Sequence, residues 1–252
     1  DAACDWSSDV CSSDLWLCVW LWPLEHPSPL LNARLTRDPT RWRLGLRYGL
    51  GALGLIILAF TLGGGWLWLL WPALALGLIK ANYVVLGASG FQKRADGQLT
   101  PAARWLYAPY LAAAWLNSRW WTRTHPQPDL IVDNVWLGRL PTAREQGAFK
   151  AIVDLCAELP INPQGRAYQG IPVLDLIAPT PAECLQAAQA IERLRASGPV
   201  LVCCALGYSR SATAVAAWLL HSGRAATVDQ ALAIIRTRSE EHTSELQSHA
   251  AS

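Results

Sequence analysis

The longest uncharged stretch of the chain, Tyr48 to Ile79, limits what the first half can fold into. As one helix, these 32 residues would be about 48 Å long, whereas the hydrocarbon core of a bilayer is about 30 Å thick. Three glycines, Gly63 to Gly65, interrupt the stretch. The pattern therefore predicts an α-helical transmembrane region with two spans, near Leu44–Leu62 and Trp66–Ala88, that turns at the glycines.

Basic residues flank both open ends of this hairpin: Arg34, Arg37, Arg41, Arg43 and Arg47 before it, and Lys93, Arg94 and Arg104 after it. The positive-inside rule therefore predicts that both ends face the cytoplasm. Lys80 falls inside the second span, where we expect its ammonium group to snorkel to the interface. An intramembrane partner for Lys80 is the alternative.

The segment Pro101–Trp121 mixes aromatic and aliphatic residues with Arg104, Asn117 and Arg119. This composition is typical of a helix that lies at a membrane surface, and Pro109 predicts a break in it. A short third span is the alternative, and it would move everything that follows to the other side of the membrane. The predicted membrane region covers residues 16–124.

Both ends of the chain resemble in-frame translations of the adapters used in short-read DNA sequencing, at Asp5–Leu15 and Arg238–His249. We expect residues 1–15 and 238–252 to be artefacts of this kind. Five of the seven cysteines lie between these ends, and their spacing matches no metal site. An odd number of thiols without such spacing predicts a reducing compartment, with neither a disulfide framework nor a bound metal.

After a proline-containing linker that starts at His125, short β runs alternate with amphipathic helices, which predicts an α/β domain over residues 125–237. A capping box at Thr180 and Glu183 opens one helix, whose predicted core face holds Leu185, Ala188, Ile191 and Leu194. The strand candidates are Leu130–Val132, Val135–Leu137, Ala151–Leu155, Pro172–Leu176 and Pro199–Cys203.

The last of these strands leads into a loop in which Cys204 and Arg210 enclose five residues, followed by a predicted helix at Ser211–His221. Backbone N–H groups in such a loop, together with the start of the helix, converge on an anion and favour the Cys204 thiolate as a nucleophile. The guanidinium of Arg210 can bind two phosphoryl oxygens, and Ser211 can donate a hydrogen bond to the sulfur. The predicted phosphate-binding residues are Ala205, Leu206, Gly207, Tyr208, Ser209 and Arg210.

This segment resembles the signature loop of cysteine-dependent protein tyrosine phosphatases of the dual-specificity branch, and residues 129–236 resemble that domain throughout, including IVDNVWLGRLPTA and IPVLDLIAPTPAE. The region ahead of it resembles bacterial membrane-anchored members. The resemblance implies a central mixed sheet flanked by helices, no cofactor, and a general acid at Asp175, with Asp154 as the competitor. Cys203 stands where that family usually has a histidine, which puts activation of Cys204 in question.

The predicted function is hydrolysis of phosphomonoesters through a phosphocysteine intermediate, catalysed by Cys204, Arg210, Asp175 and Ser211 on the cytoplasmic face of a bacterial inner membrane. The substrate is a phosphorylated protein or a phospholipid headgroup, not nucleic acid. Because Arg210 is the only basic residue of the loop, a polyphosphoinositide is disfavoured, and a phosphatidylglycerophosphate-type lipid stays open. A non-catalytic phosphate-binding module and a thiol-dependent reductase or sulfurtransferase are the alternatives. Glu158 is expected to orient a loop.

Overall fold

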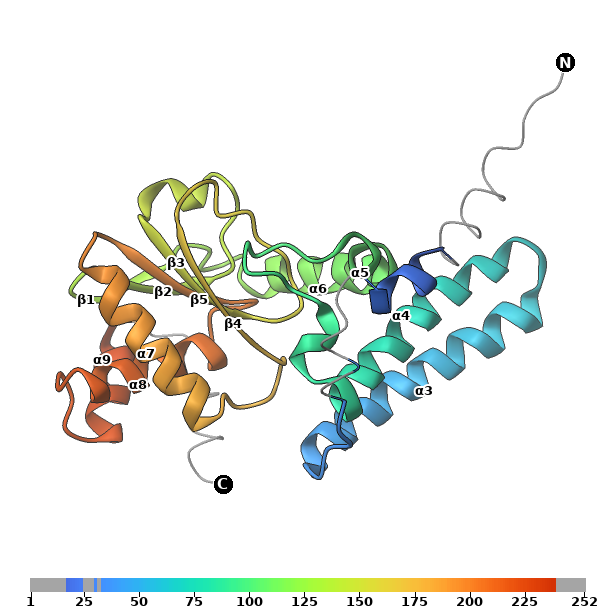
Figure 1. Cartoon of the computed structure of the whole chain (residues 1–252), viewed down its shortest axis with the longest axis horizontal. Coiled ribbons are helices and arrows are strands. Elements are labelled where there is room, and N and C mark those ends of the chain that lie inside the picture. The colour runs from blue at the N-terminus through green and yellow to red at the C-terminus, as the bar shows by residue number, and fades with distance from the viewer. Residues whose placement is uncertain (1–16, 25–29, 31–32, 239–252) are drawn as a thin grey trace, which may run out of the picture. The chain divides into compact units, whose positions relative to one another are not determined.

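The computed structural model describes residues 17–24, 30 and 33–238, which form two compact units (Figure 1). The first holds the described residues up to Arg94 together with Leu99–Ala113, and the second holds Ala95–Gln98 and the chain from Ala114 onward. The predictions for residues 1–15 and 239–252 lie outside the described residues. Each unit has its own core, so each is described by itself.

The first unit is helical, and two of its helical runs are long and apolar enough to cross a membrane: Pro39–Leu62 and Gly64–Leu86. Their bounds overlap those of the two predicted spans, whose position in a membrane stays a prediction. The chain turns between them at Gly63 and Gly64, whose φ angles of 61° and 52° suit glycine. Its helices are α3 (Pro39–Leu62), η1 (Gly64–Leu69), α4 (Leu70–Ala81), η2 (Asn82–Leu86), η3 (Ala88–Phe91) and α5 (Pro101–Leu106). Helix α6 (Ala108–Trp121) begins in the first unit and passes into the second at Ala114.

Small residues let α3 pack closely against the second helical run. A Cβ atom on Gly45 would lie 2.6 Å from Val84 Cγ2, and one on Gly49 would lie 3.0 Å from Lys80 Cδ. The aliphatic part of Lys80 therefore lies over Gly49, and the residue is exposed. Snorkelling of its ammonium group stays a prediction. Arg41 Nε donates to the carbonyl of Tyr83 at 2.8 Å, which places a cation at the C-terminal end of this run.

The predicted surface helix is divided into α5 and α6, with the break at Tyr107, near Pro109 as predicted. Thr100 caps the start of α5 by accepting from the N–H of Ala103. Pro109 lies in the first turn of α6, where a missing N–H breaks no helical hydrogen bond. The proline therefore marks the start of a helix, and the break falls just before it.

The second unit is built on a five-stranded mixed sheet in the order β1-β2-β5-β3-β4. Strand β1 is antiparallel to β2, and the other neighbours are parallel. This confirms the predicted α/β class with a central mixed sheet. The strands are β1 (Asp129–Val132), β2 (Val135–Arg139), β3 (Ala151–Cys156), β4 (Ala167–Val173) and β5 (Val200–Cys204), and η4 (Glu145–Ala148) precedes β3.

The prediction of a strand at Pro172–Leu176 was wrong in its position, because β4 runs from Ala167 to Val173. Strand β4 forms one edge of the sheet and pairs only with β3. An edge strand tolerates polar residues such as Gln169 and a proline such as Pro172. Its start therefore lacks a hydrophobic signal, and Leu174 to Leu176 lie in the loop that follows.

Three helices lie on one side of the sheet in Figure 1: α7 (Pro181–Arg195), α8 (Ser209–His221) and α9 (Val228–Arg238). The predicted capping box at the start of α7 is confirmed. Its predicted core face was partly wrong, because Leu185 is 48% exposed whereas Ala187 and Ala190 are buried. These alanines let α7 pack closely against α8, whose Trp218 is fully buried in the core. Helix α9 was not predicted from the sequence.

Candidate active site

The site lies where β5 ends and α8 begins. Strand β5 is completely buried between β2 and β3, and its last residue is Cys204. Helix α8 starts at Ser209, two residues before the predicted start, so Arg210 belongs to its first turn. The predicted order of strand, loop and helix start is therefore present, and the loop is short enough to turn its amides toward the end of the strand.

The loop is folded tightly against β2. Gly207 has a φ of 84°, and a Cβ atom on it would lie 2.5 Å from the backbone nitrogen of Arg139. Only glycine fits a position with both a positive φ and so close a backbone. In this conformation the N–H of Gly207 donates to Cys204 Sγ at 3.3 Å. At least one loop amide therefore points at the sulfur, as the anion-binding prediction requires.

The sulfur of Cys204 has a second partner on α8. Its distance to Ser211 Oγ is 3.3 Å, and either atom can be the donor. Cys204 is 3% exposed and Ser211 is fully buried. In the described part of the chain, no side chain caps the start of α8, which leaves the first-turn N–H groups to bind an anion. Cys204 and Ser211 are therefore placed together, as predicted.

Arg210 is buried and is held by a carboxylate that binds it end-on. Its Nη1 and Nη2 atoms donate to the two oxygens of Glu158 at 2.9 and 2.7 Å. Nη1 also donates to the carbonyl of Val173 at 2.8 Å. Burial alone would lower the pKa of Arg210, but the negative charges of Glu158 and Asp175 raise it well above its ordinary value. The guanidinium is therefore a fixed cation.

Glu158 has a more specific role than the expected orientation of a loop. It is 2% exposed, and although burial alone would raise its pKa, the charge and hydrogen bonds of Arg210 lower it below the ordinary value. The only signal in the sequence is one acidic residue between Ala157 and Leu159, directly after a buried strand. A buried acid needs a partner, but the sequence does not show which one.

Asp175 is brought to the site, and Asp154 is not. Asp175 Oδ1 accepts from Arg210 Nη2 at 3.0 Å, and its side chain is 36% exposed. Asp154 is buried, where it accepts from the N–H of Cys156 at 2.8 Å and from the hydroxyl of Tyr168 at 3.0 Å. Of the two candidates, Asp175 is therefore the one that contacts Arg210, and Asp154 makes structural hydrogen bonds.

Two other thiols of the second unit, Cys203 and Cys156, are buried in its sheet. Cys203 is fully buried within β5, where it pairs in register with Gly138 on one side and Asp154 on the other. Cys156 is fully buried as well, and its sulfur accepts from the N–H of Leu159 at 3.4 Å. Among the described residues there is no group of three or more His, Cys, Asp or Glu that could hold a metal ion.

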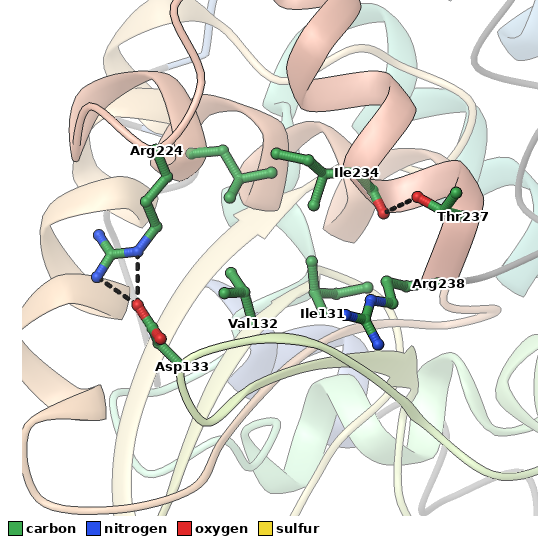
Figure 2. Close-up of a pocket in the computed structure, with 8 residues that line it drawn as sticks. Ile131, Val132, Asp133, Arg224, Ile234, Thr237 and Arg238 are labelled. Carbon is green, nitrogen blue, oxygen red and sulfur yellow. Dashed lines mark hydrogen bonds and ion pairs between the residues drawn. The ribbon is translucent and has the colours of Figure 1, made fainter.

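A separate hollow of about 370 Å³ lies at the opposite end of the sheet (Figure 2). Val132 on its rim pairs with Val135 at the start of β2, which pairs with Val200 at the start of β5. The hollow is therefore one strand length away from Cys204. Asp133 and Arg224 form an ion pair at 2.8 Å across one side of it. It belongs to the region around α9 and not to the candidate active site.

Comparison with known proteins shows which protein family the second unit resembles. Residues 135–251 match the family described as "Dual specificity phosphatase, catalytic domain". The match covers β2 to α9, and with them Glu158, Asp175, Cys204 and Arg210. The second unit is thus an α/β phosphatase-like domain with a cysteine-arginine loop. Residues 135–251 thus form a domain of the cysteine-dependent, dual-specificity-phosphatase-like superfamily.

Several solved structures are similar to part of the chain. The active form of Tk-PTP is 27% identical, with a TM-score of 0.42, and the alignment covers 50% of this chain and 96% of Tk-PTP. Human DUSP28 is 24% identical over 46% of this chain and 82% of its own, with a TM-score of 0.38. PTPMT1 is 21% identical over 49% of this chain and 98% of its own, with a TM-score of 0.37. No curated protein matches the chain significantly.

Proposed function

We propose that the protein is a membrane-anchored phosphatase that hydrolyses phosphomonoesters through a phosphocysteine intermediate. The observation that carries this proposal is the position of Cys204 Sγ, which lies 3.3 Å from both the Gly207 N–H and Ser211 Oγ at the start of a helix. An amide, a hydroxyl and a helix N-terminus all favour negative charge on that sulfur. A nucleophile and an anion site therefore coincide.

In the first step the Cys204 thiolate attacks phosphorus, so that an S–P bond forms while the ester P–O bond breaks. The leaving oxygen takes a proton from the carboxyl group of Asp175. In the second step water attacks the phosphocysteine and gives its proton to Asp175. The S–P bond then breaks, phosphate is released, and Ser211 donates a hydrogen bond to the departing thiolate.

Arg210 and Asp175 explain how the phosphoryl group enters. Glu158 accepts from both Nη atoms at the end of the guanidinium. A phosphoryl group that accepts two hydrogen bonds would therefore bind along the side of the guanidinium, to Nε–H and to the second N–H of Nη2. Asp175 Oδ1 now accepts from Nη2 on that edge. A phosphoryl oxygen that takes its place leaves Asp175 next to the ester oxygen, where a general acid is needed.

The substrate is a phosphomonoester on a protein or on a phospholipid headgroup. No Lys, Arg or His lies between Cys204 and Arg210, and a single guanidinium suits one phosphoryl group better than several. The two candidate spans, α3 and the run Gly64–Leu86, would hold the domain close to a membrane surface. We place the domain on the cytoplasmic side of a bacterial inner membrane, in line with the basic residues at both open ends of the hairpin.

The test uses the full chain in detergent micelles with para-nitrophenyl phosphate as substrate. We expect steady turnover that is lost in Cys204→Ser. We expect kcat to fall about a hundredfold in Asp175→Asn, because proton transfer to the leaving oxygen contributes on that order. Cys184→Ser is the matched thiol control, since Cys184 lies on α7 and contacts the carbonyl of Pro179, and it should keep wild-type turnover.

Two results would contradict the proposal in different ways. Saturable binding of inorganic phosphate without turnover would indicate a non-catalytic phosphate-binding module. Thiol-dependent arsenate reduction, or formation of thiocyanate from cyanide and a sulfur donor, would indicate a reductase or a sulfurtransferase that uses the same loop.

A further inference from the structure

A serine from outside the matched domain contacts the phosphate-binding loop. Ser118 lies on α6, and its Oγ donates to the carbonyl oxygen of Ala205 at 2.5 Å. Ser118 is 2% exposed and Ala205 is 8% exposed, so water does not compete for this bond. Ala205 is the residue directly after Cys204, and 87 positions separate it from Ser118 in the sequence.

The direction of this carbonyl determines the direction of the next amide. In a trans peptide the C=O of one residue and the N–H of the following residue point in opposite directions. Because Ser118 holds the Ala205 oxygen on the α6 side, the N–H of Leu206 must point to the other side. The next amide, that of Gly207, points at the sulfur of Cys204. The Ser118 contact therefore favours a loop whose consecutive amides turn inward.

Ser118 is itself fixed by the strand behind the loop. Thr122 Oγ1 donates to the Ser118 carbonyl at 2.7 Å, and Arg139 Nη1 donates to Thr122 Oγ1 at 2.8 Å. Arg139 ends β2, where it pairs in register with Cys204, and it forms an ion pair with Glu145 at 2.7 Å. Arg119 Nη2 also donates to the carbonyl of Leu140 at 2.8 Å. These residues all belong to the second unit.

We propose that Ser118 is a positioning residue that holds the Leu206 amide toward the phosphoryl group by fixing the Ala205 carbonyl. This inference rests on the proposed function, because it requires the loop to bind a phosphoryl oxyanion. It extends the working site beyond the matched domain, into the helix that joins the domain to the membrane region. Without the Ser118 hydroxyl, the Ala205 carbonyl loses its buried donor and the peptide is free to rotate.

The test is the affinity of the full chain for tungstate, measured calorimetrically in detergent micelles. Tungstate is an oxyanion, so its Kd measures anion binding by the loop without requiring turnover. We expect Ser118→Ala to raise the tungstate Kd about fivefold, the effect of one lost hydrogen bond, and Ser118→Thr to restore it. Ser222→Ala is the control. It removes an equivalent hydroxyl, which donates to the Trp218 carbonyl at 2.7 Å far from the loop, and should lower the melting temperature without changing Kd.

A wild-type Kd in Ser118→Ala, or an equal loss of affinity in Ser222→Ala, would overturn the positioning role. If Ser118→Ala does not fold, Ser118→Cys, which keeps the size but weakens the donor, is expected to show the same direction of change, and an unchanged Kd there counts against the role. Tungstate binding without phosphatase turnover would contradict the proposed function and still decide the role of Ser118. No tungstate binding by the wild type would reject both.

Discussion

The buried pair of Glu158 and Arg210 shows how two charges can be kept inside a small domain. Both side chains are 3% exposed, and the two carboxylate oxygens meet the two Nη atoms of the guanidinium. Removing one partner of such a pair leaves an uncompensated buried charge, which costs about 3–5 kcal/mol. Glu158 thus stabilises the domain and also leaves one edge of Arg210 to face the ligand.

The pair predicts how stability depends on pH. Because the pKa of Glu158 is lower in the folded protein, its contribution is fully present above the unfolded pKa of about 4.3 and is lost as the pH falls below it. Arg210, whose pKa is raised, stays protonated throughout this range. We therefore expect Glu158→Gln to lower the free energy of unfolding by about 3 kcal/mol at pH 7, and by progressively less below pH ~4.

Urea denaturation of the full chain in micelles checks this, with alkylation of the buried Cys156 as the signal for unfolding of the second unit. Asp133→Asn is the control, since it breaks an exposed ion pair with Arg224 and should cost no more than about 1 kcal/mol. If the free energy of unfolding of Glu158→Gln differs from that of the wild type by the same amount at every pH from 3 to 8, Glu158 is not the origin of the acid sensitivity.

The conformation of the loop between β5 and α8 depends on Gly207, which lies against the backbone of β2. Gly207→Ala would place a methyl group 2.5 Å from the Arg139 nitrogen and would force a non-glycine residue to a φ of 84°. The backbone of β2 cannot move away without losing hydrogen bonds to its neighbours β1 and β5. We expect Gly207→Ala to abolish tungstate binding and to lower the free energy of unfolding by about 1–3 kcal/mol.

Gly147→Ala provides the matched comparison, because Gly147 lies in η4, has no positive φ and would have no atom within 4 Å of an added Cβ. It should bind tungstate with the wild-type Kd and melt within a degree or two of the wild type. Equal behaviour of the two alanine variants would mean that the loop does not need the tight approach to β2.

The order of strand, loop and helix was predictable because it depends on neighbouring residues. An apolar strand, Gly207 and a helix of small residues follow one another within Val200–His221, and the capping box at Thr180 has the same local character. Glu158 and Ser118 were not predictable as partners of the site, because they are 52 and 87 positions away from the residues they contact. Strand β4 was misplaced because an edge strand needs no alternating pattern.

The two units differ in how many large apolar side chains they expose. In the first, large apolar side chains along α3 and around the glycine turn are exposed, among them Leu46, Ile57, Phe60 and Trp68 at 54–67%. A soluble unit rarely exposes so many large apolar residues together. In the second, the large aliphatic side chains are mostly collected in one core between the sheet and α7 to α9. These surfaces support the proposed membrane anchoring, in which lipid surrounds the first unit and water surrounds the second.

Membrane topology tests this inference together with the number of spans. With two spans, the glycine turn and the phosphatase-like domain lie on opposite sides of the membrane, whereas a third span at Pro101–Trp121 would put them on the same side. Gly65 and Ser197 are both exposed, one at the turn and one after α7. We expect a membrane-impermeant maleimide to label Gly65→Cys in intact cells and Ser197→Cys only in inside-out vesicles.

The wild type gives the background labelling of the native thiols, and detergent-permeabilised cells give the maximum for each variant. Labelling of both variants in intact cells would support three spans and would place the domain outside the cytoplasm. Labelling of neither in intact cells but of both in inside-out vesicles would mean that α3 and α4 do not cross the bilayer. Only the alternating result agrees with a domain that reaches its substrates from the cytoplasmic surface.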